Sequence, residues 1–261
     1  MTTKNMMSYS IFVIFHKELH EEQYAGKEKY FKFAKVGDQP KKIRSEEINK
    51  NVVECSSLSG FTPKGKEWAE SEFLISLYNT IKKDLNFLNG STHIGFLQYD
   101  HTCISKSGID IIEYLNTNCE KIDSNTVLSF VPINLEWEIY SNRICMDFSD
   151  PQKQYGNPSC YFPMIAAYNK FYETKYTYSE FITNSKHKSL SLCSSFVMTV
   201  DNYMKMMEFS IWAAETQNID QFDPAKIWRA PGGLMERYYA TWLCLSNIKL
   251  IDSALGELPK F

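Results

Sequence analysis

The sequence predicts an α/β fold in which a mainly parallel sheet is flanked by helices within a single domain. Three observations predict it. Short runs of β-branched and aromatic residues alternate along the chain with longer segments whose apolar residues recur at helical spacing. No repeat, low-complexity tract or linker rich in glycine, proline and serine divides these segments. The 261 residues are enough for one large domain of this kind.

The predicted strands are short and bounded by polar residues. They cover residues 10–15, 30–36, 93–99, 127–133 and 194–199. The first is typical of a buried central strand, because positions 11–15 are all β-branched or aromatic and a polar His16-Lys17 pair follows. Residues 40–66 are rich in Lys, Glu, Asn, Ser and Gly, so we expect a surface excursion there.

The predicted helices cover residues 69–83, 109–115, 164–172, 200–216 and 234–246. The first of them carries apolar residues at Phe73, Leu77 and Ile81, the stripe of an amphipathic helix. Residues 151–163 contain three prolines and a glycine, which predicts a loop. Strands separated by helices of this length predict a mainly parallel sheet that is covered on both faces.

Composition excludes several classes of protein. The formal net charge is −3, from 28 basic and 31 acidic residues, so we expect no nucleic-acid partner. No apolar run approaches the roughly 18 residues of a membrane span, and we expect neither a transmembrane segment nor a signal peptide. The seven cysteines include no C-x-x-C pair, which indicates reduced thiols in a cytoplasmic protein rather than zinc or a disulfide framework.

The first candidate site lies where predicted strands end. Ligands of parallel α/β sheets bind beyond the carboxyl ends of the strands, where Asp100 and His101 follow the third predicted strand. A carboxylate oxygen and an imidazole nitrogen would suit Mn²⁺ better than Mg²⁺. The alternative is a turn that begins with Asp100 and leaves His101 exposed. After the first strand, Lys17 would add a point charge for a phosphate.

The second candidate site is the segment 228–239 near the end of the chain. Its Pro231-Gly232-Gly233 sequence predicts a tight turn that lets a ligand approach the backbone closely. Glu236 would then lie in or near the first turn of a helix, where its carboxylate could take a proton from a hydroxyl group. The alternative is that Glu236 complements the helix dipole and Arg237 joins a surface ion pair.

Several nucleotide and hydrolase motifs are missing from the sequence. It contains neither G-x-G-x-x-G nor G-x-x-x-x-G-K-[ST], so dinucleotide-binding and P-loop classes lose their main support. It also lacks the G-x-S-x-G elbow of an α/β-hydrolase.

Short segments in a shared order resemble a family of GT-A glycosyltransferases found in bacterial capsular and cell-surface polysaccharide clusters and in some large viruses. The matching segments are the strand ending in His16-Lys17, the helix at 71–78, the strand at 95–101, residues 195–198 with Tyr203, and Arg229, Gly233, Glu236 and Arg237. The chain departs from the family at Gly233, which is displaced by one residue, and at the strand end, where the family's His-Tyr-Arg-Arg is Gln98-Tyr99-Asp100-His101 here.

This resemblance implies one GT-A-like glycosyltransferase domain over residues 1–261, with a nucleotide-sugar-binding part in about 8–135 and an acceptor-binding part in about 136–250. It implies an enzyme that moves a sugar from a nucleotide-diphosphate-sugar donor to a hydroxyl of a glycan acceptor. Glu236 would be the general base of an inverting displacement. Donor-binding positions would be His16, Lys17, Val36, Tyr99, Asp100 and Arg229, and acceptor-binding positions Gly232, Gly233 and Arg237. Asp100 and His101 would hold Mn²⁺ or Mg²⁺ in place of the family's arginines.

Two other kinds of protein stay open at this point. One is a module that keeps the same fold but binds glycan without turnover. The other is a nucleotidyltransferase that acts on sugar phosphates, although the sequence after Phe15 lacks the glycine-rich basic loop that such an enzyme needs.

Overall fold

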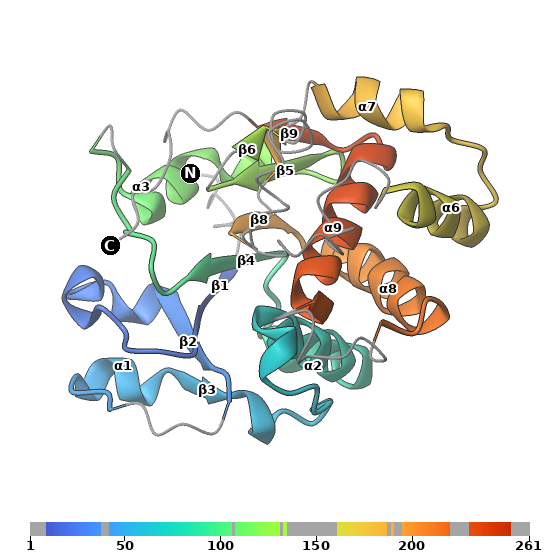
Figure 1. Cartoon of the computed structure of the whole chain (residues 1–261). Helices are drawn as coiled ribbons and strands as arrows, with labels where there is room; N and C mark the ends of the chain where they lie inside the picture. Colours follow the sequence, from blue (N-terminus) through green and yellow to red (C-terminus); the bar gives the residue numbers. More distant parts are fainter. Residues whose placement is uncertain are drawn as a thin grey trace, which may run out of the picture.

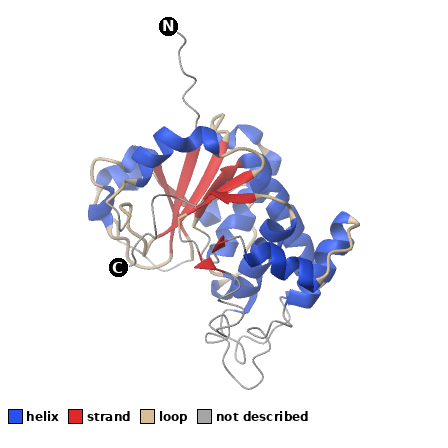
Figure 2. Cartoon of the chain, turned by 90° about the horizontal axis from the view of Figure 1, so that it is seen from above, coloured by secondary structure: helices blue, strands red, loops and turns tan. Residues whose placement is uncertain are grey.

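The computed structural model describes residues 9–37, 42–105, 108–130, 133–134, 161–186, 189–190, 195–219 and 230–251. In this part of the chain, helices cover both faces of a central sheet (Figures 1 and 2). The predicted α/β class is therefore confirmed. No helix within these ranges has the length and apolar character needed to cross a membrane.

The elements follow one another along the chain with these bounds. The strands are β1 Tyr9–Phe15, β2 Phe31–Lys35, β3 Val52–Glu54, β4 His93–Gln98, β5 Thr126–Ser129, β6 Ile133–Asn134, β7 Ser189–Leu190, β8 Phe196–Thr199 and β9 Lys249–Ile251. The α-helices are α1 Glu46–Lys50, α2 Glu70–Lys83, α3 Ile111–Asn118, α6 Tyr161–Tyr172, α7 Tyr178–Lys186, α8 Val200–Thr216 and α9 Ala230–Leu245. The 3₁₀ turns are η1 Glu21–Tyr24, η2 Glu28–Tyr30, η3 Cys55–Ser57, η4 Lys66–Trp68, η5 Leu85–Leu88 and η6 Cys119–Lys121.

The main sheet has seven strands in the order β3-β2-β1-β4-β8-β5-β9. All neighbours pair in parallel except β8, which runs antiparallel to both β4 and β5, so the mainly parallel prediction is confirmed. From β1 the chain moves outward to β2 and β3, and it then returns to β4 on the other side of β1. The carboxyl ends of β1 and β4 therefore lie side by side at a topological switch point, where α/β sheets bind ligands.

Alternating side chains of the strands build two separate apolar layers. In β1, Phe12 and Ile14 face the layer formed with α2, α6, α8 and α9. Val13 and Phe15 point to the opposite layer, which includes residues of α1 and α3. This two-residue alternation is what a strand buried on both faces requires. Since both faces of the sheet are covered, we expect ligands to bind at the carboxyl ends of the strands.

Helices α2, α8 and α9 pack together on one side of the sheet (Figure 1). The Tyr203 hydroxyl of α8 donates to the Leu74 carbonyl of α2 at 2.6 Å. The Tyr239 hydroxyl of α9 donates to Ser71 Oγ of α2 at 3.2 Å. The first hydrogen bond fixes α8 against α2, and the second fixes α9 against the first turn of α2.

The prediction of a surface excursion at 40–66 is wrong in part, because α1 and β3 lie in this region. Ser45 Oγ accepts the Ile48 N–H at 3.3 Å and caps the short α1. β3 is a three-residue edge strand whose side chains are all half-buried. Elements this short leave no apolar period in the sequence.

Several predicted boundaries also differ from the structure; the helix expected at 109–115, for example, is α3 at Ile111–Asn118. The strand expected at 127–133 ends at Ser129, and β6 pairs with β7 in a separate two-stranded sheet. Of the loop expected at 151–163, residues 151–160 lie outside the described residues and 161–163 form the first turn of α6. The last helix begins at Ala230 instead of residue 234. Proline is tolerated in a first helical turn, where its missing N–H removes no hydrogen bond, and Pro163 and Pro231 occupy such turns.

The described cysteines lead to a prediction about alkaline stability. Cys55, Cys103, Cys119 and Cys244 are buried free thiols. Burial raises the pKa of Cys103 to about 12 from an ordinary value of 9.0. A raised folded pKa means that the thiol's contribution to stability is complete below the unfolded pKa and is lost as pH rises through the folded pKa. We expect the free energy of unfolding to fall from about pH 9 to about pH 12.

Urea unfolding at a series of pH values tests this expectation. The Cys103→Ala variant should show a shallower alkaline decline than the unsubstituted protein, because one raised thiol pKa has been removed. Equal slopes for the two proteins between about pH 9 and about pH 12 would contradict it.

Candidate active site at the carboxyl edge of the sheet

The exits of β1 and β4 meet at one point of the sheet edge. The rings of His16 and Tyr99, one residue beyond each strand, touch edge to face with centroids 5.0 Å apart. Both side chains are half-buried, whereas Lys17 is exposed. The Tyr99 N–H donates to the Ile14 carbonyl at 3.1 Å and so continues the pairing past the end of β4. The structure thus brings together residues that lie more than 80 positions apart in the sequence.

Of the other predicted donor-binding residues, Val36 is buried in the apolar layer and only its backbone reaches this edge. Its N–H donates to the Phe15 carbonyl at 3.0 Å. Asp100 is half-buried directly after Tyr99. Arg229 lies outside the described residues.

His101 is buried at this edge of the sheet and contacts the neighbouring strand segment. Its side chain is 0% exposed, and its Nδ1 lies 3.2 Å from Ser195 Oγ, just ahead of β8. The same Ser195 Oγ accepts the Gln98 N–H at 3.3 Å. The His101 N–H donates to the Gln98 carbonyl at 3.1 Å and closes the turn. The expectation of an exposed His101 beside a turn is therefore wrong, because the imidazole anchors that turn to the neighbouring strand.

The predicted metal site fits the described residues only in part. Asp100 offers a carboxylate oxygen, which is the kind of ligand that Mn²⁺ and Mg²⁺ accept. His101 is fully buried, and its Nδ1 lies within hydrogen-bonding distance of Ser195 Oγ. Across the described ranges, no group of three His, Cys, Asp or Glu residues can hold a metal ion. Among the described residues, Asp100 and His101 do not form a complete metal site.

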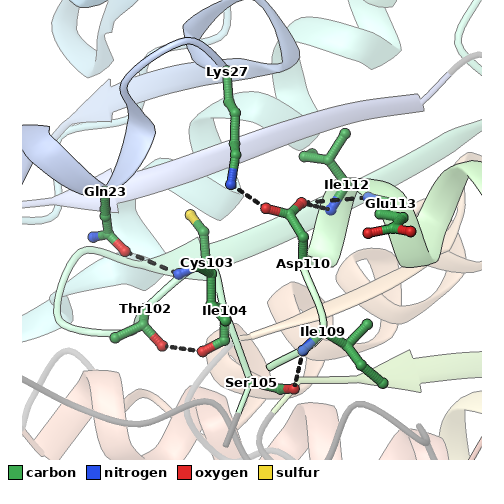
Figure 3. Close-up of polar contacts among 10 residues, drawn as sticks. All are labelled: Gln23, Lys27, Thr102, Cys103, Ile104, Ser105, Ile109, Asp110, Ile112 and Glu113. Carbon is green, nitrogen blue, oxygen red and sulfur yellow. Dashed lines mark hydrogen bonds and ion pairs between the residues drawn. The ribbon is translucent and has the colours of Figure 1, made fainter. Parts of the chain in front are cut away.

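The loop after Asp100 is tied to the segment that follows β1 (Figure 3). Gln23 Oε1 accepts the Cys103 N–H at 3.0 Å. At the far end of the loop, Lys27 forms an ion pair with Asp110. Asp110 Oδ1 also accepts two backbone N–H groups of the first turn of α3, at 2.8 and 3.3 Å. These contacts hold both ends of the loop and so fix the turn at Asp100.

Removing the Asp110 carboxylate should therefore weaken the fold. We expect Asp110→Ala to lower the free energy of unfolding by about 2 kcal/mol, because α3 loses its N-cap and Lys27 loses a half-buried partner. The matched control is Asp201→Ala, whose ion pair with Lys205 is exposed, with side chains 65% and 58% accessible. Its effect should stay within about 0.5 kcal/mol. Equal losses in the two variants, measured by urea unfolding, would contradict this role of Asp110.

The start of α9 packs directly against the backbone of η4. A Cβ built on Gly232 would lie 3.1 Å from the carbonyl oxygens of both Glu67 and Trp68. The prediction of a tight turn at 231–233 is wrong, because these residues form the first turn of α9. The absent side chain of Gly232 lets the helix approach the protein's own backbone. Its contact with an acceptor, and that of Gly233, stay predictions.

Arg237 and Glu236 lie in the second turn of this helix. Arg237 is only 4% exposed, and its Nη1 donates to the Gly233 carbonyl one turn earlier. A surface ion pair is therefore the wrong interpretation of Arg237. Glu236 is half-buried and lies beyond the first turn of α9. The helix dipole acts most strongly within that first turn, so it has less influence on Glu236.

Glu70 is the residue that sequence reasoning missed. It begins α2, is 8% exposed, and its Oε1 accepts from Gln98 Nε2 at 3.4 Å. Tyr239 has its pKa raised chiefly by burial, and the charges of Glu236 and Glu70 raise it further. The Tyr239 hydroxyl donates to Ser71 Oγ, next to Glu70 in α2, at 3.2 Å. The exit of β4, the start of α2 and the second turn of α9 meet at this point.

The backbone just before Glu70 is strained. Ala69 has φ 48° and ψ −130°, in the left-handed half of the map that favours glycine. Such conformations cost about 1–3 kcal/mol, persist only where the surroundings enforce them, and cluster at functional sites. No pattern of residue types pairs Glu70 with Gln98 or marks Ala69, so this part of the site cannot be predicted from local sequence.

Comparison with known proteins supports the fold. No protein-family model matches the sequence, and no curated protein matches it. The apo structure of the bifunctional glycosyltransferase WbbM is similar, with a TM-score of 0.55 and 15% sequence identity. The match covers 96% of this chain and 44% of that chain, so this chain spans less than half the length of WbbM. The chain therefore has a fold similar to that of a glycosyltransferase, while the predicted capsular-polysaccharide family stays a prediction.

Proposed function

We propose that this protein is a glycosyltransferase that moves a hexosyl or pentosyl unit from a nucleotide-diphosphate-sugar donor to a hydroxyl of a glycan acceptor. One set of contacts supports the proposal: Glu70 of α2 accepts a hydrogen bond from Gln98 at the β4 exit, and Ser71 of α2 accepts one from Tyr239, three residues after Glu236 on α9. These contacts support one site that includes both candidate segments. The likeness in fold to a glycosyltransferase supports the same class.

In this proposal the donor binds where β1 and β4 end. The half-buried rings of His16 and Tyr99 offer an apolar surface for the nucleotide. The exposed Lys17 ammonium offsets part of the diphosphate charge. Arg229 is assigned to the donor as well, by its place in the sequence pattern.

The proposed reaction is an inverting displacement at the anomeric carbon. The Glu236 carboxylate takes the proton of the acceptor hydroxyl as its oxygen bonds to the anomeric carbon. The bond from that carbon to the diphosphate oxygen breaks on the opposite face, and its electron pair leaves with the nucleoside diphosphate. Glu70 is a positioning residue that holds Gln98, while Gly232, Gly233 and Arg237 flank the acceptor.

A divalent cation is a separate part of the proposal. Mn²⁺ or Mg²⁺ on the Asp100 carboxylate would neutralise charge on the leaving diphosphate when bound. Excess EDTA should then lower the transfer rate at least about tenfold, and added Mn²⁺ should restore it. Full activity in excess EDTA would remove the cation while leaving the transferase proposal intact.

The division of the chain is proposed on the same basis. Glu70 and Gln98 lie in the donor-binding part, about 8–135, and Glu236 lies in the acceptor-binding part, about 136–250. We assign both parts to one domain, residues 1–261, in a cytoplasmic protein that has no nucleic-acid partner.

A thermal-shift screen of nucleotide sugars, with and without Mn²⁺, tests the function. A donor at 100 times its Kd should stabilise the fold by about 2.7 kcal/mol. The donor found is then incubated with glycan acceptors, and release of nucleoside diphosphate is measured. Glycan binding without release would indicate a binding module, and pyrophosphate release from a sugar phosphate with a nucleoside triphosphate would indicate a nucleotidyltransferase. If no nucleotide sugar stabilises or reacts, the proposal fails.

A further inference from the structure

A cavity lies between α2, α8 and the segment 62–68, outside the site described above. Its volume is about 120 Å³. Apolar walls come from Trp68, Ile75 and Ile211. Asn79 of α2 and Glu215 of α8 stand among them. The proposed reaction uses none of these five side chains.

The wall formed by segment 62–68 is fixed to α2. The Thr62 N–H donates to Ser76 Oγ at 3.1 Å. Glu72 Oε2 accepts the N–H groups of Lys64 and Gly65 at 2.7 and 2.6 Å. A wall held by hydrogen bonds to a helix needs little ordering when a ligand enters, which favours binding. The cavity is thus built into the fold.

The lining combines the two kinds of contact that a sugar ring needs. A pyranose has apolar C–H faces that pack on Trp68, Ile75 and Ile211. Its hydroxyls act as both donors and acceptors around the ring. The Glu215 carboxylate accepts, and the Lys64 ammonium, 4.4 Å from the centre of the Trp68 ring, donates.

The size of the cavity limits what it can hold. One water-sized sphere needs about 10–15 Å³ of this volume, so the cavity holds roughly ten atoms of that size. That is enough for the six ring atoms of one pyranose and for some of its substituents. A nucleotide-diphosphate sugar is several times larger, so this cavity is not a donor site.

We propose that the cavity binds one monosaccharide unit of the glycan acceptor, next to the unit that reacts. Trp68 in its wall and Glu70 in the candidate active site are two residues apart, at most about 7 Å along the chain. The Trp68 carbonyl also faces Gly232 at the start of α9. The inference rests on the proposed function only in naming the acceptor as the source of the ring.

Saturation-transfer NMR with the methyl glycosides of glucose, galactose, mannose and N-acetylglucosamine tests the cavity without requiring turnover. We expect at least one glycoside to bind, and Glu215→Ala to weaken it about tenfold through loss of a charged acceptor. The matched control is Glu208→Ala, an exposed carboxylate on the same helix outside the cavity lining, which should bind like the unsubstituted protein. Since Glu215 is exposed, its substitution should leave the fold intact.

Two results would overturn the inference: no glycoside binds the unsubstituted protein, or Glu215→Ala binds as tightly as Glu208→Ala. Donor stabilisation, measured in parallel by thermal shift, should be unchanged in Glu215→Ala. If the unsubstituted protein binds a donor but no glycoside in the cavity, the cavity proposal alone is refuted. If no nucleotide sugar stabilises the protein but a glycoside still binds in the cavity, the transferase proposal is refuted and the cavity proposal is kept.

Discussion

Replacing Glu236 with Gln should lower kcat for sugar transfer by about 10²–10⁴-fold, the usual contribution of a general base. The amide keeps the size of the side chain but cannot accept the proton of the acceptor hydroxyl. Donor binding should be unchanged, because Glu236 acts on the acceptor side. The measurement is nucleoside diphosphate release at saturating donor and acceptor, together with the donor thermal shift.

Two comparisons make the Glu236 result specific. Glu208→Gln removes an exposed carboxylate on α8 and should leave kcat unchanged. Glu70→Gln should cost less than Glu236→Gln and should keep the acidic limb of the pH–rate profile, because Glu70 positions Gln98 and takes no proton. If Glu70→Gln instead abolished that limb while Glu236→Gln transferred sugar at full rate, the base assignment would pass to Glu70.

Gly232→Ala is expected to have the second largest effect on catalysis. The added Cβ would lie 3.1 Å from two backbone carbonyl oxygens of η4, closer than they tolerate without moving. Helix α9 would shift away from η4, and Glu236 with it. Misplacement of a catalytic group by about 1 Å can cost about 10²-fold in rate. The neighbouring atoms must move by only a few tenths of an ångström, so we expect kcat to fall by about tenfold, accompanied by lower stability.

Gly90→Ala is the control for this substitution. Gly90 has φ 76° and no atom within 4 Å of a Cβ placed on it, so Ala adds backbone strain without a clash. It lies before β4, at the end of the strand away from the site. We expect Gly90→Ala to lose stability by about 1 kcal/mol and to keep its kcat. Equal kcat in the Gly232→Ala and unsubstituted proteins would show that the contact with η4 does not set the position of Glu236.

Long periodic segments were predictable from the sequence. Helix α8 begins and ends at the expected residues, and β1 differs by one, because their apolar patterns extend over whole elements. The parallel sheet followed from the alternation of such segments. The antiparallel direction of β8 did not follow, since its four residues look the same whichever way the strand runs. Helix α1 and strand β3 were missed because elements of five and three residues leave no apolar period in the sequence.

The candidate site was predictable only where it follows the ends of strands. That His16 and Tyr99 meet follows from the rule that parallel strands end at one edge. The burial of His101 depends on Ser195, which is 94 positions away, and no local pattern reveals such a partner. In the sequence, Glu70 resembles an ordinary carboxylate in the first turn of a helix. Only the structure shows its contact with Gln98. Tertiary contacts between unrelated segments decide these roles.

Hydrogen–deuterium exchange of the intact protein, with and without its nucleotide-sugar donor and a glycan acceptor, tests most directly whether the two segments share one ligand site. We expect slower exchange on ligand binding in the peptides that contain Tyr99 to His101 and in those that contain Pro231 to Arg237. Protection that is confined to one of these segments, or that falls elsewhere in the chain, would contradict it.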